Sequence, residues 1–432
     1  MERFALSRMK EWKENENRKP LIIRGARQVG KTWIMKTFGQ QYFEKTAYVN
    51  FDNNARMKQV FEGDLDIERL VLSISAETGV SIEAENTLII FDEVQEVPKA
   101  LTSLKYFYEN APQYAIVAAG SLLGVALHQG TSFPVGKVDF LDLYPLNFRE
   151  FLCAMGEKQF VSMLDSCDTQ MVTVFKTKYI ERLREYYFVG GMPEVVKDFS
   201  EKKDYNRVRA IQKNLINYYQ QDFSKHAEIK LVPRLNLVWN SIPMQLAKEN
   251  KKYIYGQVRE GSRAKDFELA IQWLLDCGLI HKVQRIQKPD LPLKAYIDFD
   301  AFKLFLVDIG LLIAMTDLDA KVIIEGNKIF TEFKGALTEQ YILQQLISDV
   351  GVIPYYYSTQ NSKGEIDFLV QGKTSVIPIE VKAEENLKAK SLKAFCEKYQ
   401  PSYAVRTSMS DYREQDWMTN IPLYAIKWIE NY

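Results

Sequence analysis

The fold class of this chain follows from one stretch, Gly25-Ala26-Arg27-Gln28-Val29-Gly30-Lys31-Thr32. It comes after the apolar run PLII at 20–23 and before WIMKTF at 33–38, so we expect a strand, a glycine-containing loop and a helix in this order. The spacing G-x-x-x-x-G-K-[ST] is typical of a phosphate-binding loop. Gly25 and Gly30 allow the tight turn that points backbone N–H groups at phosphates, beside the positive end of a helix. A chance match between an apolar strand and a helix is the weaker interpretation, and the stretch predicts an α/β P-loop fold.

Two side chains of this loop are expected to act on the nucleotide. Lys31 can reach the β- and γ-phosphates, and the hydroxyl of Thr32 can take a place on Mg²⁺. ATP and Mg²⁺ are therefore the predicted cofactors. The predicted nucleotide-binding residues are Gly25, Ala26, Arg27, Gln28, Val29, Gly30, Lys31, Thr32 and Trp33.

A second apolar run, TLIIFDEVQ at 87–95, ends in two carboxylates. A buried strand followed by two acidic residues is the Walker B arrangement that completes a P-loop site. Asp92 would hold the Mg²⁺ shell, and Glu93 would orient or polarise the attacking water. We therefore predict Glu93 and Lys31 as catalytic residues. The alternative is a plain strand whose acidic pair caps the helix that follows.

A third apolar run, at 114–119, predicts a further buried strand that ends at Gly120-Ser121. A polar residue at the tip of this strand, beside the Walker B strand, can sense the γ-phosphate in P-loop ATPases. Ser121 fits that role and is our third candidate catalytic residue. It equally fits a plain cap for a helix over 122–127, and the sequence does not choose between the two.

Length and composition set the wider frame. A chain of 432 residues is expected to form two or three domains. Lysine plus arginine equals aspartate plus glutamate at 56 each, so nucleic-acid binding would need a local basic patch. The four cysteines and three histidines form no metal-type or redox-type spacing, which favours reduced thiols in the cytoplasm.

Hydropathy favours a soluble protein. The start of the chain, MERF, has no apolar signal segment. The longest apolar stretches, at 114–127 and 302–315, are too short to span a membrane or contain charge, namely Lys303 and Asp308. We therefore expect a cytoplasmic protein without a membrane partner.

Several motifs together resemble one family. They are RKPLIIRGARQVGKT at 18–32, FDEVQ at 91–95, GS at 120–121, YPLNFREF at 144–151 and GGMPE at 190–194. The pattern is similar to that of prokaryotic AAA-type ATPases with a C-terminal domain of long-unknown function that resembles a PD-(D/E)XK nuclease. The resemblance covers nearly the whole chain. One departure is Gly136-Lys137, where members often show Gly-Arg, so any role of that arginine in nucleotide sensing or between subunits is in doubt.

The resemblance and the hydrophobic pattern together imply an α/β chain of four parts. These are a P-loop AAA-type ATPase core at 1–155, a helical lid at 156–230, a winged-helix-like domain at 231–325 and a restriction-endonuclease-like α/β domain at 326–432. In the third part, helices at 238–249 and 264–277 precede the start of a strand at 279–283 and an apolar strand and turn at 302–311. Its local basic residues are Lys248, Lys251, Lys252, Arg259, Arg263 and Lys265. They fit a DNA contact, a protein contact or a solvated face.

The last part carries a candidate nuclease site. Glu339 falls in a predicted helix, Asp367 in a strand, and Glu380 and Lys382 in the strand SVIPIEVK at 375–382. Alternation along this strand puts Glu380 and Lys382 on one face. Asp367 and Glu380 could hold a second divalent metal, Lys382 could orient water or stabilise charge on a phosphate, and Glu339 could complete the shell. The alternatives are ordinary solvated positions or a structural or DNA-binding remnant that does not cut. A closing strand is expected near 423–428.

These observations lead to one hypothesis and two alternatives. The first is a Mg²⁺-dependent ATPase whose hydrolysis moves or gates the downstream domains. The alternatives are an ATP-gated, metal-dependent DNA endonuclease and a nucleotide-switched DNA- or protein-binding regulator with little turnover. Expected partners are ATP, DNA, an unidentified protein and further copies of the chain. Arg149, Arg182 and Arg184 are possible donors of an arginine to a neighbour's site.

Overall fold

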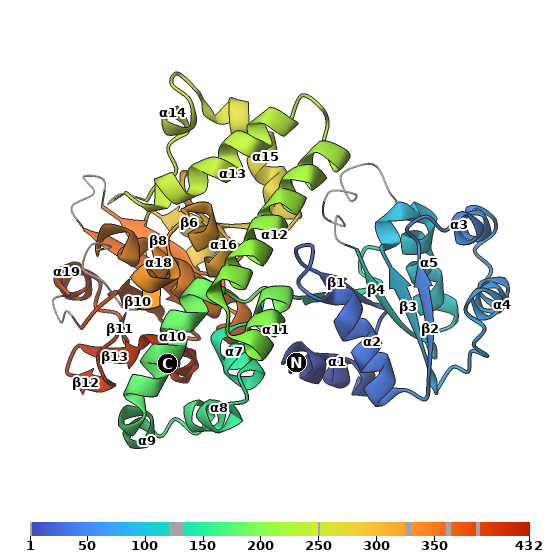
Figure 1. Ribbon diagram of the computed structural model, residues 1–432, viewed down its shortest axis with the longest axis horizontal. Helices are drawn as coiled ribbons and strands as arrows, with labels where there is room; N and C mark the ends of the chain where they lie inside the picture. The colour runs from blue at the N-terminus through green and yellow to red at the C-terminus, as the bar shows by residue number, and fades with distance from the viewer. Residues whose placement is uncertain are drawn as a thin grey trace. The chain divides into compact units, whose positions relative to one another are not determined.

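The computed structural model describes residues 2–120, 124, 133–248, 251–324, 331–359, 364–385 and 389–432. The chain divides into two compact units, each described here by itself (Figure 1). The first unit comprises residues 2–144 with 276–278, and the second comprises 145–275 with 279–432.

The first unit is built on a five-stranded sheet in the order β2-β3-β4-β1-β5, and all its strand pairs are parallel. The strands are β1 (Leu21–Arg24), β2 (Lys45–Asn50), β3 (Thr87–Asp92), β4 (Ala115–Ala119) and β5 (Asp139–Asp142). The helices are α1 (Ala5–Glu14), α2 (Lys31–Tyr42), α3 (Ala55–Glu62), α4 (Ile67–Thr78), η1 (Val94–Glu96) and α5 (Pro98–Asn110). Because parallel strands share one carboxyl edge, the loops after β1 and β3 lie at the same edge of the sheet.

Helices cover both faces of this sheet. Alternate strand residues such as Val49, Phe91 and Ile116 pack with side chains of α3, α4 and α5 in one buried cluster. Helix α2 packs against β2, β3 and β4, and α1 packs in turn on α2, where the ring centroids of Trp12 and Phe38 lie 6.3 Å apart. The buried strands read as continuous apolar runs because both of their faces are covered.

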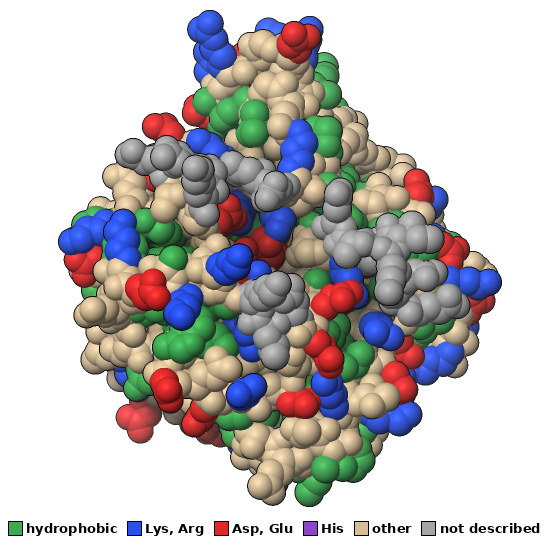
Figure 2. Space-filling view, turned by 90° about the vertical axis from the view of Figure 1, so that its left-hand side faces the viewer, with side chains coloured by type: hydrophobic (Ala, Val, Ile, Leu, Met, Phe, Trp, Pro, Cys, Tyr) green, Lys and Arg blue, Asp and Glu red, His purple; other side chains and the backbone are tan. Residues whose placement is uncertain are grey.

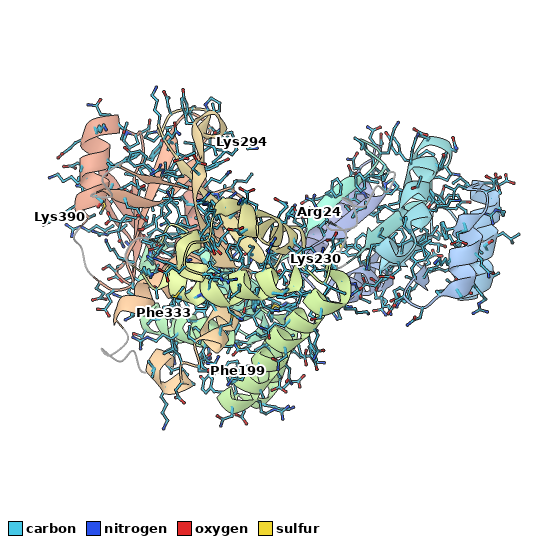
Figure 3. All side chains as sticks on the ribbon, turned by 90° about the horizontal axis from the view of Figure 1, so that it is seen from above. Arg24, Phe199, Lys230, Lys294, Phe333 and Lys390 are labelled. Atoms are coloured by element: carbon cyan, nitrogen blue, oxygen red, sulfur yellow. The ribbon has the colours of Figure 1, made fainter. Side chains whose placement is uncertain are left out.

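Two local sequence signals place elements of the first unit. Helix α5 begins at Pro98, where the missing N–H costs nothing because the first helical N–H groups have no partner within the helix. Strand β5 is fixed to β1 by Arg24, whose guanidinium makes two hydrogen bonds with Asp142, at 2.8 and 3.0 Å (Figure 3 labels Arg24).

The second unit begins with a run of helices. They are α7 (Phe148–Ala154), α8 (Lys158–Asp165), α9 (Thr169–Val174), α10 (Lys176–Val189), α11 (Pro193–Lys202), α12 (Tyr205–His226), α13 (Val232–Leu246), α14 (Tyr255–Val258) and α15 (Ala264–Asp276). Later helical segments are η2 (Leu293–Tyr296), α16 (Ile309–Met315), α17 (Ala320–Ile324), α18 (Thr331–Gln345), η4 (Leu346–Val350), α19 (Lys390–Tyr399) and η5 (Leu423–Asn431).

An eight-stranded sheet runs through this unit in the order β12-β13-β11-β10-β9-β8-β6-β7. Its strands are β6 (Ile280–Ile286), β7 (Ile297–Leu306), β8 (Tyr355–Ser358), β9 (Glu365–Gln371), β10 (Val376–Val381), β11 (Val405–Ser408), β12 (Arg413–Gln415) and β13 (Met418–Pro422). Strand β6 pairs antiparallel with β7 and parallel with β8. The sheet therefore joins strands from both sides of residue 325, where the sequence analysis placed a domain boundary.

The expected closing strand near 423–428 is wrong. Strand β13 ends at Pro422, and the 3₁₀ segment η5 follows over Leu423–Asn431. Six apolar side chains of η5 are buried, including Leu423, Ile426 and Trp428. A short apolar run buried on several sides does not distinguish a strand from a helical turn, and this is why the sequence misled.

A buried carboxylate ties the turn between α10 and α11 to the start of α16. Asp308 accepts hydrogen bonds from the backbone N–H groups of Gly191 at 2.6 Å and Leu311 at 3.1 Å. Gly190 has φ +73°, and a Cβ there would lie 2.2 Å from a carboxylate oxygen of Asp308. Both the backbone angle and the close approach require glycine in this turn.

Among the described residues, no helix is both long and apolar enough to cross a membrane.

Candidate functional site

The loop between β1 and α2 has the backbone that the motif predicts. Gly25 has φ +147°, and a Cβ on it would lie 2.1 Å from the carbonyl oxygen of Leu143. Gly30 has φ +95° and directly precedes helix α2, whose first residue is Lys31. Both glycines adopt conformations that residues with a side chain rarely take. The loop thus enters the positive end of α2, the position that suits an anion.

Lys31 is buried and held by the loop itself. Its Nζ donates hydrogen bonds to the carbonyl oxygens of Gly25 and Ala26, each at 2.8 Å. Burial lowers the pKa of Lys31 to about 8, against the opposing effect of the Glu93 and Asp92 carboxylates. The ammonium is therefore kept in the loop by neutral carbonyl groups, and an anion arriving there would stabilise its charged form.

Thr32 and Asp92 meet at the carboxyl edge of the sheet. The hydroxyl of Thr32 donates to Oδ2 of Asp92 at 2.7 Å, and the hydroxyl of Tyr48 on β2 donates to the same oxygen at 2.9 Å. Burial and the neighbouring Asp92 raise the pKa of Tyr48, so its phenol stays protonated as a donor. A hydroxyl and a carboxylate are the oxygen ligands that Mg²⁺ prefers, and this pair fits the predicted ion.

Glu93 follows β3 in a left-handed conformation, with φ 51° and ψ 45°. Its backbone N–H donates to Oδ1 of Asp92 at 3.1 Å. Its own carboxylate accepts a hydrogen bond at 2.7 Å from Nε2 of Gln95. A non-glycine residue rarely adopts this backbone conformation. Here the left-handed turn at Glu93 directs the carboxylates of Asp92 and Glu93 to different hydrogen-bond partners.

The remaining predicted residues of this site divide into two groups. Ala26 and Val29 of the loop are buried, and Trp33, in the first turn of α2, is 40% exposed. Strand β4 lies between β1 and β3, as a sensing residue at its tip would require. Ser121 itself lies outside the described residues, so its role stays a prediction.

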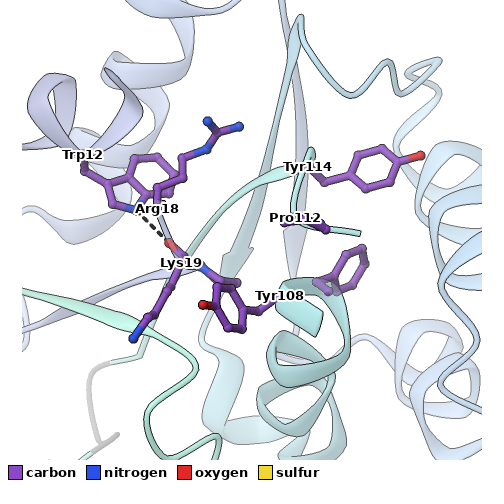
Figure 4. Close-up of a pocket in the computed structure, with 8 residues that line it drawn as sticks. Trp12, Arg18, Lys19, Tyr108, Pro112 and Tyr114 are labelled. Atoms are coloured by element: carbon purple, nitrogen blue, oxygen red, sulfur yellow. Dashed lines mark hydrogen bonds between the residues drawn. The ribbon is translucent and has the colours of Figure 1, made fainter. Parts of the chain in front are cut away.

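Lys137, the position at which the resemblance implied an arginine, lies away from the P-loop. It precedes β5, at the amino edge of the parallel sheet, and its Nζ is 3.0 Å from Glu109. A shallow depression at this edge is drawn in Figure 4, where the indole Nε1 of Trp12 donates to the carbonyl oxygen of Lys19 at 2.7 Å. Both features are at the opposite end of β1 from the nucleotide loop, so neither adds to that site.

Three arginines were considered as donors to a neighbouring site. Arg149 pairs with Asp349 at 2.9 Å and also with Asp165. Arg182 pairs with Glu157 and Glu185, both at 2.7 Å. Arg184 makes one long contact of 3.4 Å to a backbone carbonyl. Carboxylates in the same unit engage the first two arginines, and a role of any of the three at a neighbouring site stays a prediction.

The C-terminal candidates come together, with additional partners. Oε1 of Glu380 lies 2.6 Å from Nζ of Lys382, and Oδ2 of Asp367 accepts a hydrogen bond from the backbone N–H of Val381 at 2.7 Å. Glu339 of α18 faces Asp367 and forms an ion pair with Lys251. Burial and the charge of Glu339 raise the pKa of Asp367 to about 7. Among the described residues, no three histidine, cysteine or acidic side chains are arranged to hold a metal.

Two residues of the predicted basic cluster have different surroundings. Lys251 turns inward to Glu339, whereas Arg259 lines an open depression together with Arg234 and Asp266. On the face shown in Figure 2, basic and acidic side chains are interspersed. A DNA contact through this region stays a prediction.

Sequence reasoning missed four residues of these two sites: Tyr48, Gln95, Lys251 and Lys303. Gln95 stands inside a recognised motif and Tyr48 lies in β2, but no spacing rule points from either to a carboxylate. For Lys303 a signal existed, because a lysine inside an apolar strand must find a partner when it is buried.

Comparison with known proteins agrees with this geometry. An AAA domain model matches residues 17–152, and two models described as domains of unknown function, DUF8612 and DUF4143, match 180–322 and 334–426. Comparison with curated proteins gave no match.

Solved structures offer partial likenesses. The Walker-type ATPase PABY2304 of Pyrococcus abyssi is 15% identical over 73% of this chain and 95% of its own, with a TM-score of 0.45. The ORC1 protein of Aeropyrum pernix in complex with DNA is 13% identical over 72% and 91%, with a TM-score of 0.27. The RuvB Holliday junction branch migration motor of Thermotoga maritima is 11% identical over 64% and 87%, with a TM-score of 0.27. The domain match and the loop geometry together make residues 17–152 an AAA-type P-loop ATPase domain.

Proposed function

We propose that the first unit binds ATP with Mg²⁺ and hydrolyses it. The observation that carries this proposal is the contact between Thr32 and Asp92 at 2.7 Å, beside the buried Lys31. A phosphate chain bound along the loop would receive backbone N–H groups, the start of α2 and one ammonium. These groups act on the part of the nucleotide where negative charge is concentrated.

The chain's residues have distinct roles in this proposal. Thr32 and Asp92 would hold Mg²⁺, which when bound would neutralise charge on the phosphates. Lys31 would neutralise further charge, because its ammonium is kept in place without a carboxylate partner of its own at hydrogen-bond distance in the described part of the unit. Glu93 would orient a water molecule and accept its proton. Gln95 would position Glu93 through the hydrogen bond at 2.7 Å.

Coupling to the second unit is the other part of the proposal. We infer that ATP binding and hydrolysis alter what the second unit contacts, with DNA or a protein as the partner. The endonuclease alternative needs Asp367, Glu380 and Lys382 to serve a metal and a phosphate. Each of them already has an internal partner, which favours the ATPase without cleavage.

Replacing Glu93 by glutamine tests the proposal. Glutamine keeps the size of the side chain and its hydrogen bonding but cannot accept the proton of water, so ATP hydrolysis should fall by roughly 10²–10⁴-fold. ATP binding, measured with a fluorescent analogue, should be unchanged. Glu96→Gln is the matched control, because Glu96 is an exposed carboxylate three residues away. Normal turnover by Glu93→Gln would remove Glu93 from the mechanism.

A further inference from the structure

The resemblance to nucleases implies a divalent metal at Asp367 and Glu380, but these carboxylates lie in a group that already contains cations. Three acidic side chains converge there, Glu339 from α18 and Glu365 and Asp367 from β9. Two lysines that no motif predicted reach the same group, Lys303 from β7 and Lys251 from the segment after α13.

Lys303 is the central cation of this group, which we call the lysine–carboxylate cluster. Its side chain is completely buried, and its Nζ lies 4.8 Å from the ring centroid of Tyr356. From there the ammonium forms an ion pair with Glu365 and lies 3.7 Å from Oε2 of Glu339. Burial alone would lower the pKa of Lys303, but Glu339, Glu365 and Asp367 together raise it. The lysine is therefore charged, and the carboxylates around it are what stabilise that charge.

Lys251 supplies the second cation. Its Nζ pairs with Oε1 of Glu339, whose side chain is 5% exposed. Burial would raise the pKa of Glu339, but Lys251 and Lys303 lower it, so this carboxylate is ionised. The two lysines thus balance two carboxylates, Glu339 and Glu365. Asp367, whose charge would be in excess, is the group that holds a proton most readily.

The neighbouring oxygens are also in use. Oδ2 of Asp367 accepts from the backbone N–H of Val381 at 2.7 Å. In Glu380, Oε1 pairs with Lys382 at 2.6 Å and Oε2 accepts from the backbone N–H of Leu392 at 3.3 Å. A hard divalent cation needs several free oxygen ligands and would be repelled by an ammonium among them. The residues present therefore do not fit a metal.

We propose that the ammonium groups of Lys303 and Lys251 take the place of a divalent metal in the lysine–carboxylate cluster. The cluster is then balanced in charge without a metal ion, with Oε2 of Glu339 compensated by the Lys303 ammonium at 3.7 Å and not by a hydrogen bond among the described residues. It acts as a structural core that joins β7, α18 and β9. This inference goes beyond the proposed function, which placed ATP hydrolysis in the first unit and gave the second unit only a contact with DNA or a protein. It assigns the second unit a binding or scaffolding role that does not depend on metal-assisted cleavage.

Mn²⁺ binding to the full chain without nucleotide tests the proposal, with free Mn²⁺ followed by electron paramagnetic resonance. The wild type and Asp367→Asn should bind Mn²⁺ equally, because Asp367 serves no ion. Lys303→Met should gain one Mn²⁺ per chain, because it removes the internal cation and leaves the carboxylates. The double variant Lys303→Met with Asp367→Asn should lose that gain.

Two results would overturn the proposal. One is that Asp367→Asn binds one Mn²⁺ fewer per chain than the wild type. The other is that a folded Lys303→Met variant gains no Mn²⁺. If Lys303→Met does not fold, the comparison between the wild type and Asp367→Asn decides alone, because the amide resembles the protonated acid and preserves the fold. ATP hydrolysis by Asp367→Asn reports separately on the first unit.

Discussion

Each unit of this chain brings lysine and carboxylates together, but in opposite arrangements. In the first unit, Lys31 donates to two backbone carbonyls, and burial lowers its pKa to about 8. In the second unit, burial would likewise lower the pKa of Lys303, but three carboxylates raise it. The same residue types thus produce one site whose lysine is held by neutral carbonyl groups and one cluster whose lysine is paired with carboxylates.

The difference teaches how to distinguish a ligand site from a structural core that contains similar residues. A site built for an anionic ligand keeps its cation near neutral groups, so that the ligand supplies the compensating charge. A structural cluster satisfies each buried charge internally, because an unpaired buried charge is costly. Residue identity and spacing are similar in both cases, and only the partners separate them.

The largest expected effect is on the stability of the second unit. Lys303→Met should lower the free energy of unfolding by about 3–5 kcal/mol, because it leaves buried carboxylates without their cation. The matched control is Lys288→Met, whose exposed ion pair with Asp290 is screened by water, so its stability should stay close to that of the wild type. Urea unfolding in buffer without divalent metal measures both. Equal stability of the two variants would show that Lys303 is not needed for charge balance.

The corresponding change in the first unit should affect activity instead. Lys31→Met should reduce ATP hydrolysis by about 10²–10³-fold or more, because the phosphates lose a preorganised cation. Its stability should stay close to that of the wild type, since within the described ranges Lys31 makes no carboxylate contact that its loss would leave unpaired. ATP hydrolysis is measured as phosphate release. Lys10→Met, which changes a lysine on the exposed side of α1, is the control in the same assay. If Lys31→Met were much less stable than the wild type but hydrolysed ATP at the wild-type rate, the comparison between the two lysines would be contradicted.

The pH dependence of stability sharpens the same contrast. The pKa of Asp367 is raised from 3.8 to about 7 in the folded chain. Between these values the folded state keeps a proton that the unfolded state has released, so the free energy of unfolding should fall as pH rises from about 4 to about 7. Asp367→Asn should remove this contribution and unfold with a flatter pH profile.

Chemical unfolding at pH values across this range measures the effect. Other titrating groups, such as Asp308 with a pKa raised to about 6, are common to both proteins and cancel in the difference. Parallel pH profiles for the wild type and Asp367→Asn would contradict the raised pKa of Asp367.

The smallest expected effect concerns the residue that holds Glu93. Gln95→Ala should reduce the rate of ATP hydrolysis by about 10-fold with ATP binding unchanged, because the carboxylate loses the donor that orients it. Gln41→Ala, an exposed glutamine on α2, serves as the control. An unchanged rate in Gln95→Ala would mean that Glu93 is oriented without this hydrogen bond.

The sequence predicted the first unit well because its signals are local. The loop from Gly25 to Thr32, the strand that ends at Asp92 and the helix Pro98–Asn110 each occupy a short segment with its own pattern. Pairing of the strands into one parallel sheet then follows from alternating strands and helices. What could not be predicted is which side chain meets Asp92, because the contact with Tyr48 depends on the register of β2 against β3.

In the second unit the decisive contacts are between distant residues. Lys251 and Glu339 are 88 positions apart, and Lys303 and Glu365 are 62 apart. Lys303 and Asp308 counted in the sequence only as charges that argued against a membrane segment. In the structure both are completely buried and paired, because the strand and turn that carry them pack inside the unit. A hydropathy pattern shows that a charged residue stands in an apolar stretch. Which residue compensates that buried charge is known only once the fold is known.

ATP hydrolysis by full-length Asp367→Asn and Glu93→Gln, measured side by side as phosphate release with Mg²⁺, tests the central claim most directly. That claim is that catalysis belongs to the first unit and that the lysine–carboxylate cluster is structural. The account predicts that Asp367→Asn releases phosphate at the wild-type rate, whereas Glu93→Gln binds ATP and releases almost none. Loss of hydrolysis in Asp367→Asn together with normal hydrolysis in Glu93→Gln would contradict it.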